Sequence, residues 1–149
     1  MTATVVPLHK KFESPEFTDI RTCWDVVKPG LEFILSQNPY LTYMPEDVFS
    51  ECVTGKSMLF MSSLGFVVLT VQTDPFTKEK VLVLWAAYAF EHGKHTGLEH
   101  LDWIEGVATY CGCSSVEVQT AVPEVCNYLK AYGWRQEATI YKREVKSDG

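Results

Sequence analysis

The sequence lacks any apolar run long enough to cross a membrane. Its longest apolar stretch, residues 81–90, has about half the length that a spanning helix needs. The N-terminus also lacks the succession of basic, apolar and small residues that marks a secretion signal. These two absences lead us to expect a soluble, cytoplasmic protein without membrane contact.

Positive charge is also in short supply. The chain has 13 lysines and arginines against 19 aspartates and glutamates, a formal net charge of −6, and its basic residues form no stripe. Proteins that bind duplex nucleic acid need clustered basic side chains to displace counterions. We therefore expect no direct nucleic-acid binding and a partner that is cationic or neutral.

Paired metal-binding motifs are missing as well. The five cysteines are odd in number and form no C-x-x-C motif, which argues against a disulfide framework and favours reduced thiols. Cys111 and Cys113 alone supply at most two metal ligands. His92, His95 and His100 lack the i, i+4 spacing that places two imidazoles on one helix face. We predict no metal site.

The chain does contain the apolar material for a core. It is 46% hydrophobic over 149 residues, which predicts a single domain covering residues 1–149. Residues 4–10 have a strand pattern. Apolar residues recur at helical spacing over residues 18–39, where Pro29 and Gly30 predict a helix with a break or two short helices. A further helix is predicted from Pro45, a favoured first helical residue.

The second half of the chain alternates between strand and helix patterns. Short apolar runs separated by turn residues predict three consecutive strands, as an antiparallel meander, at residues 57–63, 64–73 and 80–90. The third run is apolar at successive positions, which is typical of a strand covered on both faces. Helix, strand, helix and strand patterns then follow at residues 98–113, 114–122, 123–132 and 135–145. The predicted order is β-α-α-β-β-β-α-β-α-β.

This order, with a helical crossover after the fourth strand, is similar to that of the GCN5-related N-acetyltransferase (GNAT) family over nearly the whole chain. In that family the fourth strand runs into a Gln/Arg-x-x-Gly-x-Gly/Ala loop that opens the next helix. The sequence "HGKHTG" at residues 92–97 falls in register with that loop. The resemblance implies a GNAT-like α/β (α+β) fold, with a mixed, mostly antiparallel sheet of about six to seven strands and about four helices.

The resemblance also implies a coenzyme site. Backbone N–H groups at a helix N-terminus can hold a pyrophosphate where glycines allow close approach. The implied acetyl-CoA contacts are His92, Gly93, Lys94, His95, Thr96 and Gly97 with Tyr88 and Phe90 on the preceding strand. His95 stands where the family has a glycine.

Candidate catalytic residues come from two further elements. The family often places a carboxylate base on the fourth or fifth strand, and the candidates here are Glu117 and Glu91. A carboxylate in an apolar strand is suited to general-base work, and the alternative is that Glu117 points to solvent. In the family's second motif a tyrosine protonates the departing thiolate; its place is taken by Leu129, which leaves the neighbouring Tyr128 as the implied acid.

Two functions of different classes follow. The first is an acetyl-CoA-dependent N-acyltransferase acting on an unidentified amine. The second is a catalytically degenerate protein of the same fold that serves as a structural or adaptor subunit, because His95 and Leu129 depart from the family pattern. Short, divergent GNAT-like proteins of this style are encoded by viruses, including bacteriophages, and some are virion components. A homo-oligomer or a larger protein assembly is a further expectation.

Overall fold

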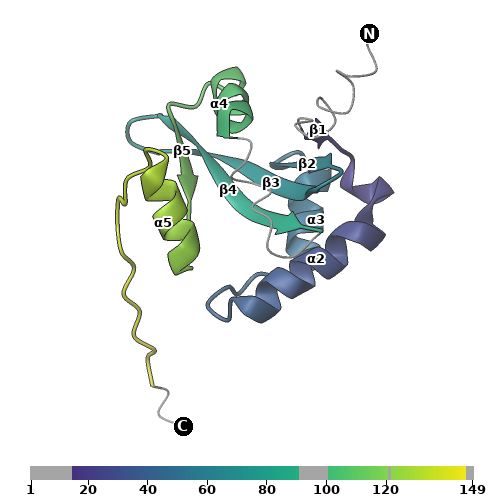
Figure 1. Cartoon of the computed structure of the whole chain (residues 1–149), viewed down its shortest axis with the longest axis horizontal. Helices are drawn as coiled ribbons and strands as arrows, with labels where there is room; N and C mark the ends of the chain where they lie inside the picture. Colours follow the sequence, from purple (N-terminus) through teal and green to yellow (C-terminus); the bar gives the residue numbers. More distant parts are fainter. Residues whose placement is uncertain (1–14, 91–100, 121, 147–149) are drawn as a thin grey trace. The chain divides into compact units, whose positions relative to one another are not determined.

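The computed structural model describes residues 15–90, 101–120 and 122–146. The chain divides into two compact units, Met1–Val118 and Gln119–Gly149. The expectation of one domain stays a prediction. Figure 1 shows the course of the chain through its helices and strands.

The first unit contains a five-stranded mixed sheet. Its strands lie in the order of the sequence: β1 (Glu16–Phe17), β2 (Ser57–Ser62), β3 (Gly65–Thr73), β4 (Lys80–Ala89) and β5 (Ser115–Val118). The pairs from β1 to β4 are antiparallel, whereas β5 runs parallel to β4. The predicted meander of three strands is therefore confirmed.

The tight connection between β3 and β4 follows from local turn chemistry. The Asp74 carboxylate accepts hydrogen bonds from the backbone N–H groups of Phe76 and Thr77, at 2.8 and 3.0 Å. Lys78 takes a left-handed backbone conformation with φ of 65°. These features reverse the chain and return it antiparallel to β3.

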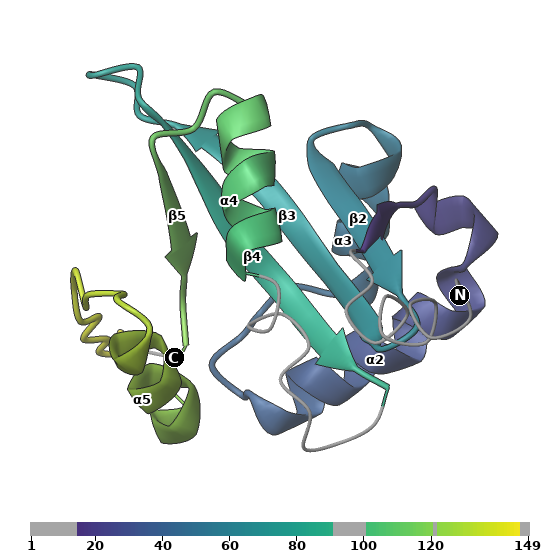
Figure 2. The ribbon, with the colours of Figure 1, turned by 45° about the horizontal axis from the view of Figure 1, so that its top comes forward.

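Helices cover both faces of the sheet. α2 (Trp24–Gln37) and α3 (Pro45–Val53) pack on one face, and α4 (Leu101–Tyr110) packs on the other (Figure 2). The first face contains the buried residues Ile20, Val27, Leu31, Val48, Leu59, Phe66, Val68 and Ala86. The second face contains Phe60, Val67, Leu69, Leu82, Leu84, Ile104 and Ala108. β4 contributes to both cores, which explains its uninterrupted apolar sequence.

The helix α2 is continuous through Pro29, so the predicted break is wrong. Proline removes one hydrogen bond, here to the carbonyl of Asp25, but both residues are exposed and water can satisfy that carbonyl. The opposite side of the helix is held by Val27 and Leu31, which are fully buried. Tertiary packing on this side therefore outweighs the local cost of the proline.

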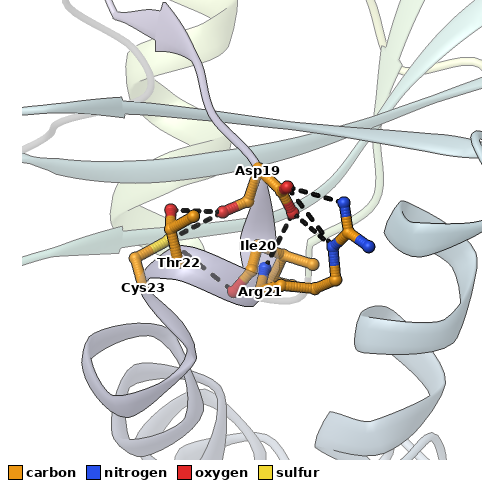
Figure 3. Close-up of polar contacts among 5 residues, drawn as sticks. All are labelled: Asp19, Ile20, Arg21, Thr22 and Cys23. Atoms are coloured by element: carbon orange, nitrogen blue, oxygen red, sulfur yellow. Dashed lines mark hydrogen bonds and ion pairs between the residues drawn. The ribbon is translucent and has the colours of Figure 1, made fainter.

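A short 3-10 helix, η1 (Ile20–Thr22), leads into α2 (Figure 3). The Asp19 side chain accepts a hydrogen bond from the Arg21 backbone N–H at 3.0 Å. It also forms an ion pair with the Arg21 guanidinium at 2.9 Å. These hydrogen bonds from Arg21 hold the pKa of Asp19 below its ordinary value. Asp19 is therefore the N-cap that starts this turn.

The helices α4 and α5 (Pro123–Ala131) end in the same local structure. Gly112 and Gly133 have φ of 75° and 90°. The next N–H groups, of Cys113 and Trp134, donate to carbonyls five residues earlier at 2.8 and 3.0 Å. This is the Schellman motif, in which a left-handed glycine ends a helix. The helix predicted to begin at Pro123 is confirmed.

The strand count differs from the prediction at both ends of the chain. The first predicted strand, residues 4–10, lies outside the described residues. The last, residues 135–145, has no strand structure although its sequence alternates. A strand pattern shows which side chains along a segment are apolar. A strand forms, however, only where a neighbouring backbone is in place to pair with it.

Candidate functional site

The strand β4 continues past the end of β5. The parallel pairing runs from Val81–Ser115 to Leu84–Val118. Residues 86–89, which follow this pairing, pair with β3. The strand β4 therefore continues past the end of β5.

A β-bulge lies where β4 leaves β5. Val68 pairs with Ala86 and Leu69 pairs with Leu84, so Trp85 is an extra residue in β4. Both Trp85 and Ala86 consequently pack on the face covered by α2 and α3. Bulges of this kind redirect side chains and are frequent beside active sites.

A pocket of about 290 Å³ opens between the C-terminal half of α2 and the end of β4. It is lined by Phe33, Ile34, Gln37, Asn38, Ala87, Tyr88 and Ala89. Its walls are apolar apart from the two amide side chains and the tyrosine hydroxyl, and no charged side chain in the described part of the chain lines it. The Asn38 side-chain nitrogen donates to the Ile34 carbonyl at 2.8 Å, which fixes that amide at the helix end. Such a mixture suits an uncharged or weakly polar molecule.

Aromatic rings and one glycine determine how closely α2 packs on the sheet beside this pocket. The Tyr88 ring lies 5.8 Å from Phe33 and 5.6 Å from Phe66, measured between centroids. A Cβ atom at Gly30 would come within 2.7 Å of the Phe66 ring and 2.9 Å of the Tyr88 ring. Gly30 therefore allows α2 to approach the sheet closely enough to form the pocket wall.

Tyr43, in the connection between α2 and α3, is the next aromatic residue along this face. Its ring packs edge-on against Trp85 with centroids 5.2 Å apart. Its hydroxyl is buried and has no hydrogen-bond partner among the described residues. Burial raises the pKa of Tyr43 above its ordinary value, so the hydroxyl keeps its proton at neutral pH.

The structure describes four of the residues predicted for the site. Tyr88 lines the pocket, and Phe90 lies 6.2 Å from it between ring centroids. Glu117 is exposed on β5, on the face away from Val116 and Val118, which pack with the core beneath α4. Tyr128 belongs to α5 in the second unit, where its ring stacks on Tyr132 at 4.5 Å.

The remaining predicted coenzyme contacts lie outside the described residues. These are His92, Gly93, Lys94, His95, Thr96 and Gly97, and Glu91 is outside as well. Sequence reasoning did not identify the pocket residues of α2 and its C-cap, namely Phe33, Ile34, Gln37 and Asn38. Nothing in a sequence shows which strand end a helix terminus will face.

In the described part of the chain, no group of three or more histidine, cysteine or acidic side chains is arranged to hold a metal ion. No helix in the same residues is long and apolar enough to span a bilayer. All five cysteines are free thiols of intermediate exposure.

The raised pKa of the Cys52 thiol predicts that the free energy of unfolding falls at alkaline pH. Burial, with a smaller contribution from the charge of Glu51, raises the pKa of Cys52 to about 11. A thiol in an unfolded chain titrates near about 8.5. The stabilisation from the protonated thiol is therefore complete below that pH and is lost as the pH rises toward 11.

We expect Cys52→Ser to remove this part of the alkaline dependence. Urea unfolding measured from pH 7 to pH 10 should show a shallower decline of stability for Cys52→Ser than for the native chain. Cys126→Ser, in the other unit, controls for loss of a thiol as such. Parallel declines in the native chain and Cys52→Ser would contradict the assignment.

Comparison with known proteins gives similarity in structure only. No protein-family model and no curated protein matches the sequence. A ribosomal-protein-alanine N-acetyltransferase from Brucella melitensis biovar Abortus 2308 matches with a TM-score of 0.65 at 12% identity, over 89% of this chain and 99% of that chain.

Two further solved structures are similar. An aminoglycoside acetyltransferase from an uncultured soil metagenomic sample, in complex with sisomicin, matches with a TM-score of 0.64 at 9% identity, over 89% of this chain and 96% of that chain. An acetyltransferase from Trypanosoma brucei matches with a TM-score of 0.59 at 10% identity, over 89% and 99% of the two chains. With the mixed sheet, the helical crossover and the separating β4 and β5, these matches show that the chain has the GNAT acetyltransferase fold.

Proposed function

We propose that the protein is an acetyl-CoA-dependent N-acyltransferase that acts on an amine. The observation that carries the proposal is the continuation of β4 past the end of β5, beside a pocket that Ala87, Tyr88 and Ala89 of this strand help to line. The fold alone does not fix this function. The pocket at the end of this strand supplies the specific support.

The residues of this edge suit the coenzyme. The pantetheine arm carries two amides and an apolar stem, and the stem suits the apolar walls of the pocket. The thioester would lie at the pocket, and its carbonyl oxygen would accept a hydrogen bond from a backbone N–H of β4. The pyrophosphate contacts predicted from the sequence are residues 92–97, which lie outside the described residues.

The reaction requires one proton to leave the amine and one to reach the leaving sulfur. A neutral amine attacks the thioester carbonyl carbon, a C–N bond forms and the C–S bond breaks. We assign the role of base to Glu117, or to a water that it orders, because Glu117 is exposed on β5 next to the strand that supplies the pocket. The acid predicted from the sequence for the coenzyme thiolate is Tyr128, or water.

Filling the pocket tests the proposal. In Gln37→Trp an indole would occupy the space that Gln37 lines. We expect at least about tenfold slower thiol release from acetyl-CoA in the presence of a panel of primary amines, which corresponds to about 1.4 kcal/mol in the barrier. Ser36→Trp is the matched control, because Ser36 lies about 100° around the same helix and does not line the pocket.

Calorimetric titration with acetyl-CoA separates binding from turnover. Binding by the native chain that is lost in Gly97→Trp would support the predicted coenzyme loop. Equal thiol release by Gln37→Trp and Ser36→Trp would contradict a catalytic role for the pocket. No binding by the native chain, with binding recovered in His95→Gly, would contradict the enzyme.

One observation favours the alternative of a degenerate structural or adaptor protein, whether in a cell or in a viral particle. No carboxylate among the described residues lines the pocket, and Leu129 occupies the position at which the family has its acid. Coenzyme binding without thiol release from any amine would support this alternative. The acceptors in the names of similar structures are too diverse to indicate the amine.

A further inference from the structure

The pocket between α2 and the end of β4 has room for one substituted aromatic ring. Its volume is about 290 Å³. A dry apolar cavity of about 150 Å³ already holds benzene, and pockets for drug-sized ligands begin at about 300 Å³. The side chains that carry the inference below all belong to the first unit. A molecule that binds wholly inside this pocket is therefore small.

Two of the side chains that line the pocket are aromatic. The rings of Phe33 and Tyr88 pack edge to face, with their centroids 5.8 Å apart. From Tyr88 the cluster continues to Phe66 at 5.6 Å and to Phe90 at 6.2 Å. Aromatic rings at such distances favour edge-to-face and offset arrangements. A ring in the pocket would extend this cluster, so the pocket favours an aromatic ligand over an aliphatic one of equal size.

The side chains at the end of α2 supply neutral amides to the pocket. These are Gln37 and Asn38. The Ile34 carbonyl can only accept, so the Asn38 side-chain nitrogen donates to it, at 2.8 Å, and the Asn38 side-chain oxygen is left to accept from a ligand. Amide groups of this kind bind a neutral N–H. An ammonium among apolar walls needs an opposite charge to offset its lost hydration.

We propose that the acceptor is a primary arylamine, a single aromatic ring that carries the reacting nitrogen directly and is uncharged at neutral pH. The inference rests on the proposed acyltransferase function. Conjugation with the ring lowers the basicity of the nitrogen, so an arylamine enters the apolar pocket without losing a proton first. An alkylamine is an ammonium at pH 7, as the side chain of lysine is, and must be deprotonated before it attacks.

The proton balance of the reaction follows from this choice of acceptor. The arylamine nitrogen attacks the thioester carbonyl carbon, a C–N bond forms and the C–S bond breaks. The nitrogen loses one proton and the coenzyme sulfur gains one, so the products are an N-aryl acetamide and a free thiol. No further proton has to be removed before the attack. The base therefore acts only as the C–N bond forms.

Two isomeric amines test the proposal. Para-toluidine and benzylamine have the same atoms and the same ring, but only in para-toluidine is the nitrogen bonded to the ring. The assay is thiol release from acetyl-CoA by the native full chain at pH 7. We expect kcat/KM to be at least about tenfold higher for para-toluidine than for benzylamine.

A charge placed in the pocket should change this preference. The carboxylate of Gln37→Glu would pair with the ammonium of benzylamine and accept its proton. The ratio of kcat/KM for para-toluidine to that for benzylamine should therefore fall at least about tenfold. Ser36→Glu is the matched control, because it adds the same charge about 100° around the helix at a residue that does not line the pocket. It should keep the native ratio.

Calorimetric titration with acetyl-CoA keeps the failure of this inference apart from the failure of the proposed function. Coenzyme binding with a preference for benzylamine would overturn the arylamine and indicate cation–π binding of an ammonium on the aromatic rings. Coenzyme binding with acetylation of neither amine would also overturn it. No coenzyme binding and no thiol release would overturn both proposals. Equal ratios in Gln37→Glu and Ser36→Glu would overturn the placement of the acceptor in this pocket.

Discussion

Replacement of Gly65 by valine is expected to lower the free energy of unfolding by more than about 3 kcal/mol, at or above the upper end of ordinary overpacking. Gly65 begins β3 opposite Ala89, and any Cβ atom there would collide with the backbone carbonyl of Tyr88. A backbone atom in a paired strand cannot rotate away as a side chain can. Relief therefore requires the end of β4 to move.

The same movement should abolish the pocket, since Tyr88 and Ala89 line it. Urea unfolding followed by tryptophan fluorescence measures the stability, and acetyl-CoA titration measures the site. Gly106→Ala is the control, because a Cβ atom at Gly106 in α4 meets nothing within 4 Å. That variant should be stabilised by about 0.5–1 kcal/mol through helix propensity. Similar stabilities of Gly65→Val and the native chain would contradict the pairing of β3 with β4 at this end.

Phe66→Ala should be the most destabilising single truncation, at about 3–5 kcal/mol. Phe66 is the largest of the fully buried side chains, with 1% of its surface exposed. It packs against Tyr88 and lies directly beneath Gly30 of α2. Its removal leaves a cavity at the place where α2, β3 and β4 meet.

Phe76→Ala provides the matched comparison, because it removes the same atoms from a side chain that is 91% exposed at the β3–β4 turn. We expect a change within about 0.5 kcal/mol. Thermal and urea unfolding of both variants measure the difference. Equal effects of the two truncations would contradict the placement of Phe66 in the core.

These two positions also link stability to function. Gly65 and Phe66 are neighbours in β3. Gly65 leaves room for the backbone carbonyl of Tyr88, and Phe66 packs against the Tyr88 ring. Tyr88 in turn lines the pocket. Variants at these positions test whether the site exists in solution. The acceptor amine is a separate question, because similar folds bind an aminoglycoside or carry the name of a ribosomal-protein-alanine enzyme.

The sequence predicted the meander and the crossover because these elements depend on local patterns. The alternation of apolar residues and the turn at Asp74 specify the strands β2 to β4. Pro45 and Pro123 at helix starts and Gly133 at a helix end are signals that act within a few residues. Local chemistry of this kind is legible without a structure.

The predictions differ from the structure where an element depends on residues that are distant in the sequence. Pro29 predicted a break, but Val27 and Leu31 hold α2 against the sheet and the helix continues. The final strand pattern at residues 135–145 forms no strand. The sequence carries the preference, whereas the neighbouring backbone decides whether it is realised.

By itself, then, the sequence determined the order and type of the elements and a resemblance to the GNAT fold, because these follow from short-range spacing. Only the tertiary structure decided that β4 continues past the end of β5, that Trp85 forms a bulge in β4, and that Gln37 and Asn38 lie beside the end of β4. Each of these is a contact between segments that are separated in the sequence, from the pair Leu69 and Leu84 to the pair Asn38 and Ala89. Such contacts are determined by which surfaces pack together, and no local pattern encodes them.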